Sequence, residues 1–266
     1  MRVTVVGCSG SLPGPRSAAS CYLVEAEGPD GAGGRRTWRL LLDLGNGAVG
    51  QLQNYVELHQ VDAVALSHLH ADHCLDLCGM YVALKYRPAG PSTSRLPVHG
   101  PAGTAARLAR AYDIDADPGM GAELDVREWQ PGEPVHIGPL RLTPYRVLHP
   151  VEAYAIRVEG PSDDPVAGTV VLAYSGDTDI CPGLAEAAEG ADVLLSEAAF
   201  QEGRDEIRGV HLTGRRAAQV ARDADVGLLV LTHLPPWNDA ATTVAQARAV
   251  WDGELEVARP GLQITL

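Results

Sequence analysis

The sequence predicts an α/β protein in which two β-sheets pack face to face between outer helices, a four-layer αββα sandwich. Strand and helix patterns occur in both halves of the chain, and the pattern repeats after Pro131. Each half would form a sheet with helices on one side. Because no low-complexity run, charge block or Ser/Pro tract resembles a linker, we expect residues 1–266 to form one domain built from two similar halves.

The first half alternates short apolar runs, which predict strands, with longer segments of helical spacing. The expected strands are Val3–Val6, Ser20–Glu25, Arg39–Asp43, Val61–Leu66 and Leu96–His99. The expected helices are Asn46–Leu58, Leu75–Tyr86 (ended by Pro88) and Gly103–Tyr112. The glycine-rich stretch Gly28–Arg36 lies between two apolar runs and is typical of a hairpin loop.

The second half follows the same alternation. The expected strands are Leu140–Val147, Ala153–Val158, Thr169–Tyr174, Val193–Leu195 and Gly227–Leu231. The expected helices are Leu184–Glu189, Thr213–Asp223 and Thr242–Trp251. Polar residues follow several of these strands directly, and strand ends are where a rigid sheet usually positions functional groups.

Composition narrows the function classes. The net charge is −13, which disfavours nucleic-acid binding through bulk electrostatics because neutralising phosphates needs a basic face. The five cysteines are odd in number and irregularly spaced, as expected in a reducing compartment. No 18-residue apolar stretch and no signal-peptide pattern is present, so we expect a cytoplasmic protein with no membrane partner.

The most informative motif is Ser67–His73 (SHLHADH), which follows the expected strand Val61–Leu66. Residues two apart in an extended chain point to the same side, so His68 and His70 can share one metal ion. Asp72 and His73 come where the chain turns into the next helix, and they face a different point. Two ligand pairs aimed in two directions suit two metal ions a few ångströms apart, an arrangement that hydrolyses substrates with water.

Three further ligand-type residues stand at strand ends in the second half of the chain. His149 closes the strand Leu140–Val147, Asp177 follows Thr169–Tyr174, and His233 follows Gly227–Leu231. Alone, each would more often be a core or surface residue. After an explicit metal motif, their positions favour a shared site.

Together, SHLHADH, His149, Asp177 and His233 resemble the metallo-β-lactamase superfamily, whose αββα fold agrees with the pattern above. The resemblance covers nearly the whole chain. It implies that His68, His70 and His149 hold one metal ion, that Asp72, His73 and His233 hold a second, and that Asp177 bridges them. Imidazole and carboxylate ligands suit Zn²⁺, with Mn²⁺ or Fe as alternatives, so two divalent metal ions are expected as cofactors.

A second pair of residues narrows the branch. Glu197, in the run Val193–Phe200, and His211, before Leu212–Gly214, resemble a proton-handling pair of the ribonuclease Z branch. A carboxylate fixes the tautomer of a neighbouring imidazole, so His211 could protonate a leaving oxygen. The alternative is that Glu197 pairs with an arginine and His211 merely begins a helix. Asp72, Glu197 and His211 are the expected catalytic residues.

The sequence differs from transfer-RNA processing enzymes of this branch in three features. The segment 150–176 leaves no room for the long arm that grips tRNA, the loop Gly7–Ser17 lacks the usual Arg-Asn pair, and His233 is followed by Leu234–Trp237 (LPPW). These features, with Cys74–Leu77 (CLDL), resemble a compact actinobacterial group of atypical cyclic-nucleotide phosphodiesterases. The resemblance implies hydrolysis of cyclic AMP to 5′-AMP by a hydroxide that bridges the metal ions.

Other functions remain open at this point. Ribonuclease Z-type tRNA 3′-processing is the first alternative. Hydrolysis of a thioester or lactone would leave Glu197 and His211 without a role, and a non-catalytic metal-bound sensor would be expected to have a site closed by four ligands. The expected partner is a small phosphodiester, with nucleic acid disfavoured, and a homodimer is the expected assembly if the chain associates.

Several other residues have two alternative interpretations each. Asp43 either orients a histidine ligand from behind or serves a turn. Trp237 either stacks on a base at the rim or packs against its own protein. Cys74 and Cys78 form either a further metal site or, more simply, buried thiols. The glycines of Gly7–Ser17 serve a tight turn or, as the lesser alternative, contact a phosphate. No role is assigned to the isolated histidines His59, His99 and His136.

Overall fold

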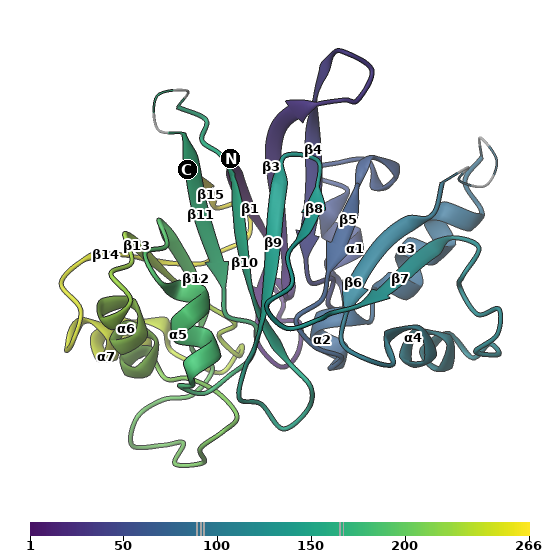
Figure 1. The fold of residues 1–266 in the computed structure, drawn as a ribbon. Coiled ribbons are helices and arrows are strands. Elements are labelled where there is room, and N and C mark those ends of the chain that lie inside the picture. The colour runs from purple at the N-terminus through teal and green to yellow at the C-terminus, as the bar shows by residue number, and fades with distance from the viewer. Residues whose placement is uncertain (89, 91, 93, 165, 167) are drawn as a thin grey trace.

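The computed structural model describes residues 1–88, 90, 92, 94–164, 166 and 168–266. Within that part of the chain, two sheets lie side by side with helices outside each of them (Figure 1). The prediction of a four-layer αββα sandwich is therefore confirmed.

The first sheet has eight strands among the described residues, and most come from the N-terminal half. Their order is β15 (Gln263–Thr265), β1 (Arg2–Ser9), β3 (Cys21–Pro29), β4 (Arg35–Leu42), β5 (Ala63–Ala65), β6 (Leu96–Gly100) and β7 (Leu124–Glu128), with β2 (Ala18–Ala19) paired to β1. β4 through β7 run parallel, and the other neighbours in this order are antiparallel. The C-terminal strand β15 thus crosses over to the sheet of the other half.

The second sheet has seven strands in the described part of the chain. Their order is β14 (Glu254–Val257), β13 (Leu228–Thr232), β12 (Val193–Glu197), β11 (Thr169–Tyr174), β10 (Tyr154–Pro161), β9 (Leu140–Arg146) and β8 (Val135–Ile137). β11 through β14 are parallel, whereas β8, β9, β10 and β11 pair antiparallel. As a result, β9, β11, β12 and β13 all end at the same edge of the sheet.

Helices cover the outer face of each sheet (Figure 1). On one side lie α1 (Ala48–Leu52), the 3₁₀ turn η1 (Leu58–Gln60), α2 (Ala71–Cys74), α3 (Leu77–Lys85) and α4 (Thr104–Tyr112); on the other lie α5 (Pro182–Ala188), α6 (Gly214–Asp223) and α7 (Ala240–Arg248). Successive side chains along a strand point to opposite faces of the sheet and so pack into two different hydrophobic cores. Leu40 and Leu42 point between the sheets, while Leu41 packs under the helices of the first layer.

Two expected helices differ from the structure. The expected helix Asn46–Leu58 is shortened to α1, which ends at Leu52. Val56, beyond the end of the helix, is still buried in the same core as Leu52. The expected helix Leu75–Tyr86 starts later, after the separate turn α2. The break is fixed at Asp76, whose side chain accepts a hydrogen bond from Val49 N (2.8 Å) and whose N–H donates to Leu44 O (3.1 Å).

Candidate metal centre

The predicted ligands come together at one edge of the two sheets, next to α2 in Figure 1. The Ser67–His73 segment follows β5, and the other ligands follow β9, β11 and β13 in the second sheet. The seven predicted ligands fall into two groups that share one residue: His68, His70, His149 and Asp177; and Asp72, His73, Asp177 and His233. No strand of one sheet alone could supply either complete group.

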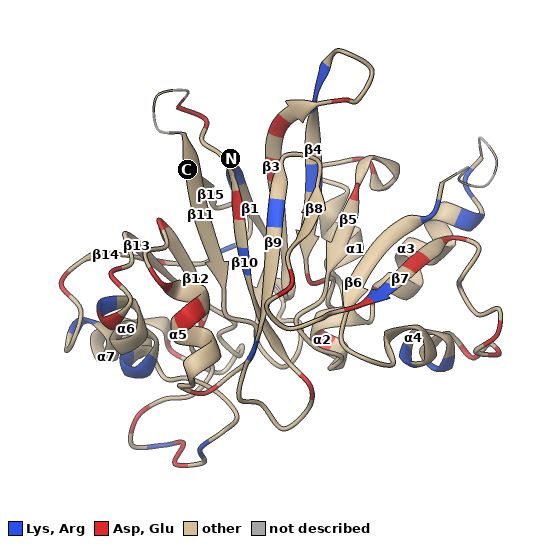
Figure 2. Ribbon diagram, in the orientation of Figure 1, with Lys and Arg blue, Asp and Glu red and all other residues tan. Residues whose placement is uncertain are grey.

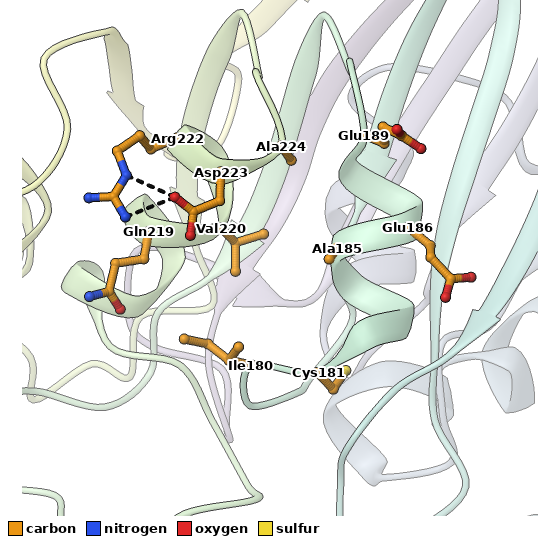
Figure 3. Close-up of a pocket in the computed structure, with 10 residues that line it drawn as sticks. All are labelled: Ile180, Cys181, Ala185, Glu186, Glu189, Gln219, Val220, Arg222, Asp223 and Ala224. Atoms are coloured by element: carbon orange, nitrogen blue, oxygen red, sulfur yellow. Dashed lines mark hydrogen bonds and ion pairs between the residues drawn. The ribbon is translucent and has the colours of Figure 1, made fainter.

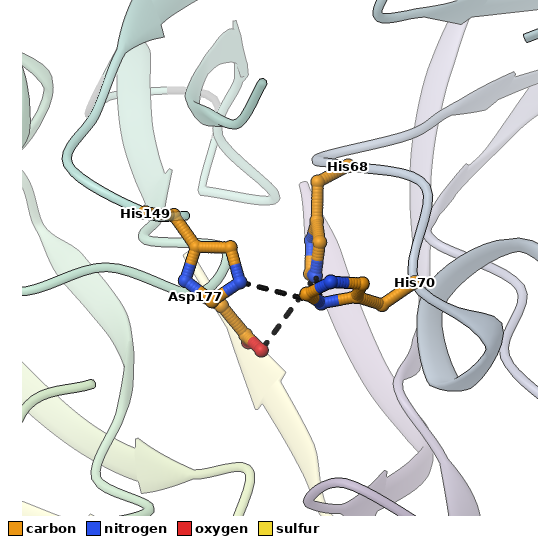
Figure 4. A group of neighbouring side chains, drawn as sticks. All are labelled: His68, His70, His149 and Asp177. Atoms are coloured by element: carbon orange, nitrogen blue, oxygen red, sulfur yellow. Dashed lines mark hydrogen bonds and ion pairs between the residues drawn. The ribbon is translucent and has the colours of Figure 1, made fainter. Parts of the chain in front are cut away.

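The first group brings three ring nitrogens around one point (Figure 4). His70 Nδ1 lies 3.0 Å from His68 Nε2 and 3.3 Å from His149 Nε2. Asp177 Oδ2 lies 3.7 Å from His68 Nε2. Zn–N bonds of about 2.0–2.1 Å in a tetrahedron put neighbouring ligand atoms about 3.3 Å apart, so this spacing suits an ion at the centre.

The second group is more regular still. His73 Nε2 lies 3.1 Å from His233 Nε2, 3.4 Å from Asp72 Oδ2 and 3.2 Å from Asp177 Oδ1. His233 Nε2 lies 3.1 Å from Asp72 Oδ2 and 3.4 Å from Asp177 Oδ1. Five edges of a four-ligand polyhedron therefore have nearly equal lengths, as tetrahedral coordination requires.

Asp177 turns one carboxylate oxygen toward each group. Its Oδ1 is buried and has no hydrogen-bond partner, although polar groups surround it. Burial opposes its charge, yet the nearby His233, His73 and His68 keep the pKa of Asp177 well below its usual range. A buried, charged oxygen without a donor is expensive unless a cation meets it. The donor set therefore fits two divalent cations joined by Asp177.

Asp43 fixes the ring of His73 from behind. Its Oδ2 accepts hydrogen bonds from His73 Nδ1 (2.7 Å), Ser67 Oγ (2.7 Å) and Tyr174 Oη (2.6 Å), and its Oδ1 accepts from Ser67 N (2.7 Å). With its proton on Nδ1, His73 presents the lone pair of Nε2 to the second group. Of the two interpretations of Asp43, as a residue that orients a histidine ligand or as a turn residue, these contacts favour the orienting role.

Two histidines of the first group have their outer nitrogens occupied as well. His149 Nδ1 lies 2.9 Å from the carbonyl oxygen of Val210 and donates to it. His68 Nδ1 lies 3.1 Å from Ser67 Oγ, which donates its own proton to Asp43. These bonds leave Nε2 of both rings as lone pairs that face the centre.

The backbone around the site has two residues with positive φ and two glycines at points of close approach. Asp43 and His233 have φ values of 59° and 57°, a strained region for residues other than glycine. A Cβ on Gly10 would collide with the carbonyl oxygen of His233, and one on Gly45 with that of Asp72. These glycines let the chain approach the ligands closely, so the loop Gly7–Ser17 serves packing of the centre.

Glu197 and His211 adjoin the second group. His211 Nδ1 lies 2.9 Å from Glu197 Oε1, and Glu197 also accepts from the N–H groups of Thr178 and Ala199 (both 3.0 Å). Burial disfavours the charged imidazole, but Glu197 outweighs it and raises the pKa of His211 to about 9. Glu197, His211 and His233 offer atoms within 4.8 Å of one another. The alternative, in which Glu197 pairs with an arginine, does not match these contacts.

Four residues around the centre, Ser67, Tyr174, Asp179 and Arg216, have contacts that the sequence does not predict. Ser67 and Tyr174 hold Asp43, and their only local signal is that each lies at or just after a strand end. Asp179 lies two residues after Asp177 and forms ion pairs with Arg208 and Arg216, which are distant in sequence. Such contacts have no periodicity that a sequence could reveal.

The remaining candidates belong to neither ligand group in the part of the chain that the structure describes. Cys74 and Cys78 direct their thiols to the carbonyl oxygens of Leu69 and Leu108 and join no ligand group among the described residues, which favours buried or half-buried thiols. Trp237 is 63% exposed, which argues against packing within its own protein.

A cavity of about 440 Å³ lies between α5 and α6, away from the ligands (Figure 3). Its floor includes Ile180, Cys181 and Val220, and an exposed ion pair of Arg222 and Asp223 lies at its rim. None of its lining residues belongs to either ligand group.

Two facing sheets with His/Asp clusters at one edge define the class of metallo-hydrolases, and comparisons with known proteins agree. The family described as "Beta-lactamase superfamily domain" matches residues 38–234, which is most of the chain. The chain therefore belongs to the metallo-β-lactamase superfamily, in its ribonuclease Z-like branch. Members of this family bind divalent metal ions, which the two ligand groups fit.

Three relatives show how the chain is placed within the superfamily. An uncharacterized protein of Mycobacterium leprae is 42% identical over 264 residues, which covers 98% of this chain and 87% of that protein. The probable metallo-hydrolase YhfI of Bacillus subtilis is 28% identical over 98% of both chains, and its crystal structure matches with a TM-score of 0.79 over 99% and 98% of the two chains. The ribonuclease Z of Haloferax volcanii is 29% identical over 99% of this chain and 94% of its own.

In the part of the chain that the structure describes, every helix is too short or too polar to cross a bilayer.

Proposed function

We propose that this protein is a dinuclear metal-dependent phosphodiesterase of 3′,5′-cyclic nucleotides. It hydrolyses cyclic AMP to 5′-AMP. The observation that carries the proposal is the Glu197–His211 pair beside the two ligand groups. An alkoxide leaves phosphorus with difficulty unless it is protonated, whereas thioesters and lactones need less help. A hydrolase of those compounds would leave this pair without a role.

The roles of the residues follow from their contacts. Two divalent ions, when bound by the seven ligands, supply Lewis acidity and lower the pKa of water. Glu197 is held by the N–H groups of Thr178 and Ala199 and in turn orients the imidazole of His211. His211 then carries its transferable proton on Nε2 and delivers it to the departing 3′ oxygen.

The small substrate is supported by the segment between His149 and Asp177. It forms the antiparallel pair β10–β11, and its described residues add no further helix or strand that could grip an RNA. Acidic and basic residues are interspersed along the ribbon of the described chain (Figure 2), and the net charge of the sequence is −13. A long RNA needs many phosphate contacts, whereas a cyclic nucleotide carries one negative charge that two cations can meet.

Apolar residues flank the candidate ligands in sequence. Leu148 and Val151 border His149, Ile207 precedes His211, and Trp237 follows His233, with exposed fractions of 48%, 38%, 66% and 63% respectively. Large apolar side chains that are exposed and near the candidate ligands in sequence suit a ligand with an apolar or aromatic part. A nucleobase stacked on Trp237 would meet that requirement.

The main alternative is tRNA 3′-processing, which the similarity to ribonuclease Z favours. Cyclic AMP and a precursor tRNA, assayed side by side at near-physiological salt with two equivalents of Zn²⁺ or Mn²⁺, separate the two functions. We expect turnover of cyclic AMP and little cleavage of the tRNA. Efficient tRNA trimming without turnover of cyclic AMP would overturn the proposal in favour of the alternative.

The role of His211 has its own test. The phenyl and p-nitrophenyl esters of thymidine 5′-phosphate differ in how much their leaving oxygen needs a proton. We expect His211→Ala to lose roughly 10²–10⁴ in rate on the phenyl ester and much less on the p-nitrophenyl ester, with two metal ions retained. An equal loss on both esters, or loss of an ion, would contradict a role in proton transfer.

A further inference from the structure

The loop between β12 and α6 carries His211 at its end and also contacts the first ligand group. Val210 O accepts the proton of His149 Nδ1 (2.9 Å), while His211 Nδ1 lies 2.9 Å from Glu197. Adjacent residues of one loop therefore orient both a candidate metal ligand and the candidate proton donor. The position of this loop decides whether the imidazole of His211 reaches a leaving oxygen.

Asp179 anchors the loop. This carboxylate is 1% exposed and accepts five hydrogen bonds. The donors are Arg208 Nε (2.7 Å) and Nη2 (3.2 Å), Gly209 N (2.8 Å), Ile180 N (2.8 Å) and Arg216 Nη1 (2.7 Å). The N–H of Asp179 donates to Leu148 O (3.0 Å). Asp179 thus joins the segments that carry His149, Asp177 and His211.

Arg216 completes the anchor from the first turn of α6. Its side chain is 6% exposed, and the Nη1 atom that pairs with Asp179 also donates to the carbonyl oxygen of His211 (3.0 Å). Its backbone N–H and its Nε donate to Thr213 Oγ1, which caps α6. A guanidinium is planar and always charged, so this fork holds the backbone of His211 in one place.

We propose that Asp179 and Arg216 are positioning residues that hold the backbone of His211 so that its imidazole stays on Glu197 and faces the leaving oxygen. This inference rests on the proposed phosphodiesterase function. The geometric demand is strict, because a displacement of about 1 Å at a reacting group can cost about 100-fold in rate. Neither residue needs to touch the substrate to have this effect.

A second ion pair on the same helix provides a matched control. Arg222 and Asp223 pair at 2.8 Å on the outward face of α6, with side chains 52% and 66% exposed (Figure 3). This pair contacts none of the candidate ligands, Glu197 or His211 among the described residues. Asp223→Asn therefore removes one carboxylate charge from α6 without touching the loop.

The experiment compares Asp179→Asn and Asp223→Asn, each alone and combined with His211→Ala, on the two aryl esters of thymidine 5′-phosphate. We expect Asp179→Asn to lose about 10- to 100-fold in kcat on the phenyl ester and a few-fold or less on the p-nitrophenyl ester. In the His211→Ala background it should cause no further loss on the phenyl ester, because residues that act through one group are not additive. Asp223→Asn should leave both rates unchanged.

Three results would overturn the inference while leaving the phosphodiesterase proposal intact. They are an equal loss on both esters, a full further loss in the His211→Ala background, and an unchanged rate on the phenyl ester. A wild-type protein that hydrolyses neither ester would instead overturn the proposed function and this inference with it. If Asp179→Asn does not fold, Arg208→Met replaces it, since Arg208 is 65% exposed and its substitution should not prevent folding. Arg208→Met should lose more rate on the phenyl ester than on the p-nitrophenyl ester, with a smaller loss than Asp179→Asn. Equal losses of rate on the two esters in this variant would overturn the inference.

Discussion

The two ligand groups differ in how firmly the protein holds them. His73 and His233 of the second group are 0% and 1% exposed, and Asp43 secures His73 from behind with a carboxylate that is itself fully buried. His70 of the first group is exposed. His149 depends on a loop carbonyl for its orientation. Every ligand of the second group is buried, whereas the first group has one exposed ligand, His70.

The contrast has a physical consequence. A fully buried ligand set is held in place by its packing before an ion arrives, whereas an exposed ligand must be ordered on binding. We therefore expect the ion of the second group to bind more tightly and the ion of the first group to exchange more readily.

Asp177 is the residue that the two groups share, so its loss should have the largest effect. We expect Asp177→Ala to lower the metal content from about two ions toward one and to abolish hydrolysis of bis(p-nitrophenyl) phosphate. Metal analysis of the purified variant, together with the rate assay, checks both parts. Two retained ions with near-normal activity would remove Asp177 from the centre.

Asp43 should affect the second group selectively. We expect Asp43→Asn to weaken the tighter of the two metal affinities by about 10- to 100-fold, because the variant no longer fixes the tautomer of His73. Calorimetric titration of the metal-free protein with Zn²⁺ resolves the two steps, and Asp223→Asn is the control. A variant whose two affinities fall by the same factor would show that Asp43 does not distinguish the groups.

The exposure of His70 should appear in the rate at which ions leave. With a chelator in excess, we expect metal release in two phases, the faster of which belongs to the first group. His70→Ala should remove the faster phase and leave the slower one. Release in a single phase from the wild-type protein with two bound ions would contradict the difference between the groups.

Asp179 is linked to the segment that carries His149 of the first group. Its substitution should have the smallest effect of the four, a change in thermal stability that depends on pH. Burial alone would raise its pKa, but Arg208, Gly209 N–H, Ile180 N–H and Arg216 lower it to about 2. An unfolded aspartate has a pKa of about 3.9, so the stabilisation is complete above about pH 4 and is lost as the pH falls through about 2.

We therefore expect metal-free Asp179→Asn to melt at a lower Tm than the wild type at pH 7. The difference should narrow as the pH falls from about 4 toward 2, where about half of the wild-type carboxylate is protonated. Thermal unfolding across this range measures it. A gap that stays constant down to pH 2 would mean that the charge of Asp179 does not stabilise the fold.

Much of this architecture could be predicted from local patterns. Buried strands such as β5 and β11 give apolar runs, and a polar residue directly after each run marks the edge where ligands gather. β14 and β15 were missed because they are edge strands whose residues are exposed or half-buried, which gives no apolar signal. Only pairing with a distant strand makes them strands.

Local periodicity and spacing are enough to predict the sandwich, the SHLHADH motif and the strand ends that bear His149, Asp177 and His233. The contacts of Asp43 with His73, and of Asp179 and Arg216 with the loop of His211, follow only from the packing of distant segments. These contacts join residues 30 and 37 positions apart in the chain. Their energies depend on burial and hydrogen-bond geometry, which exist only once the two sheets have packed.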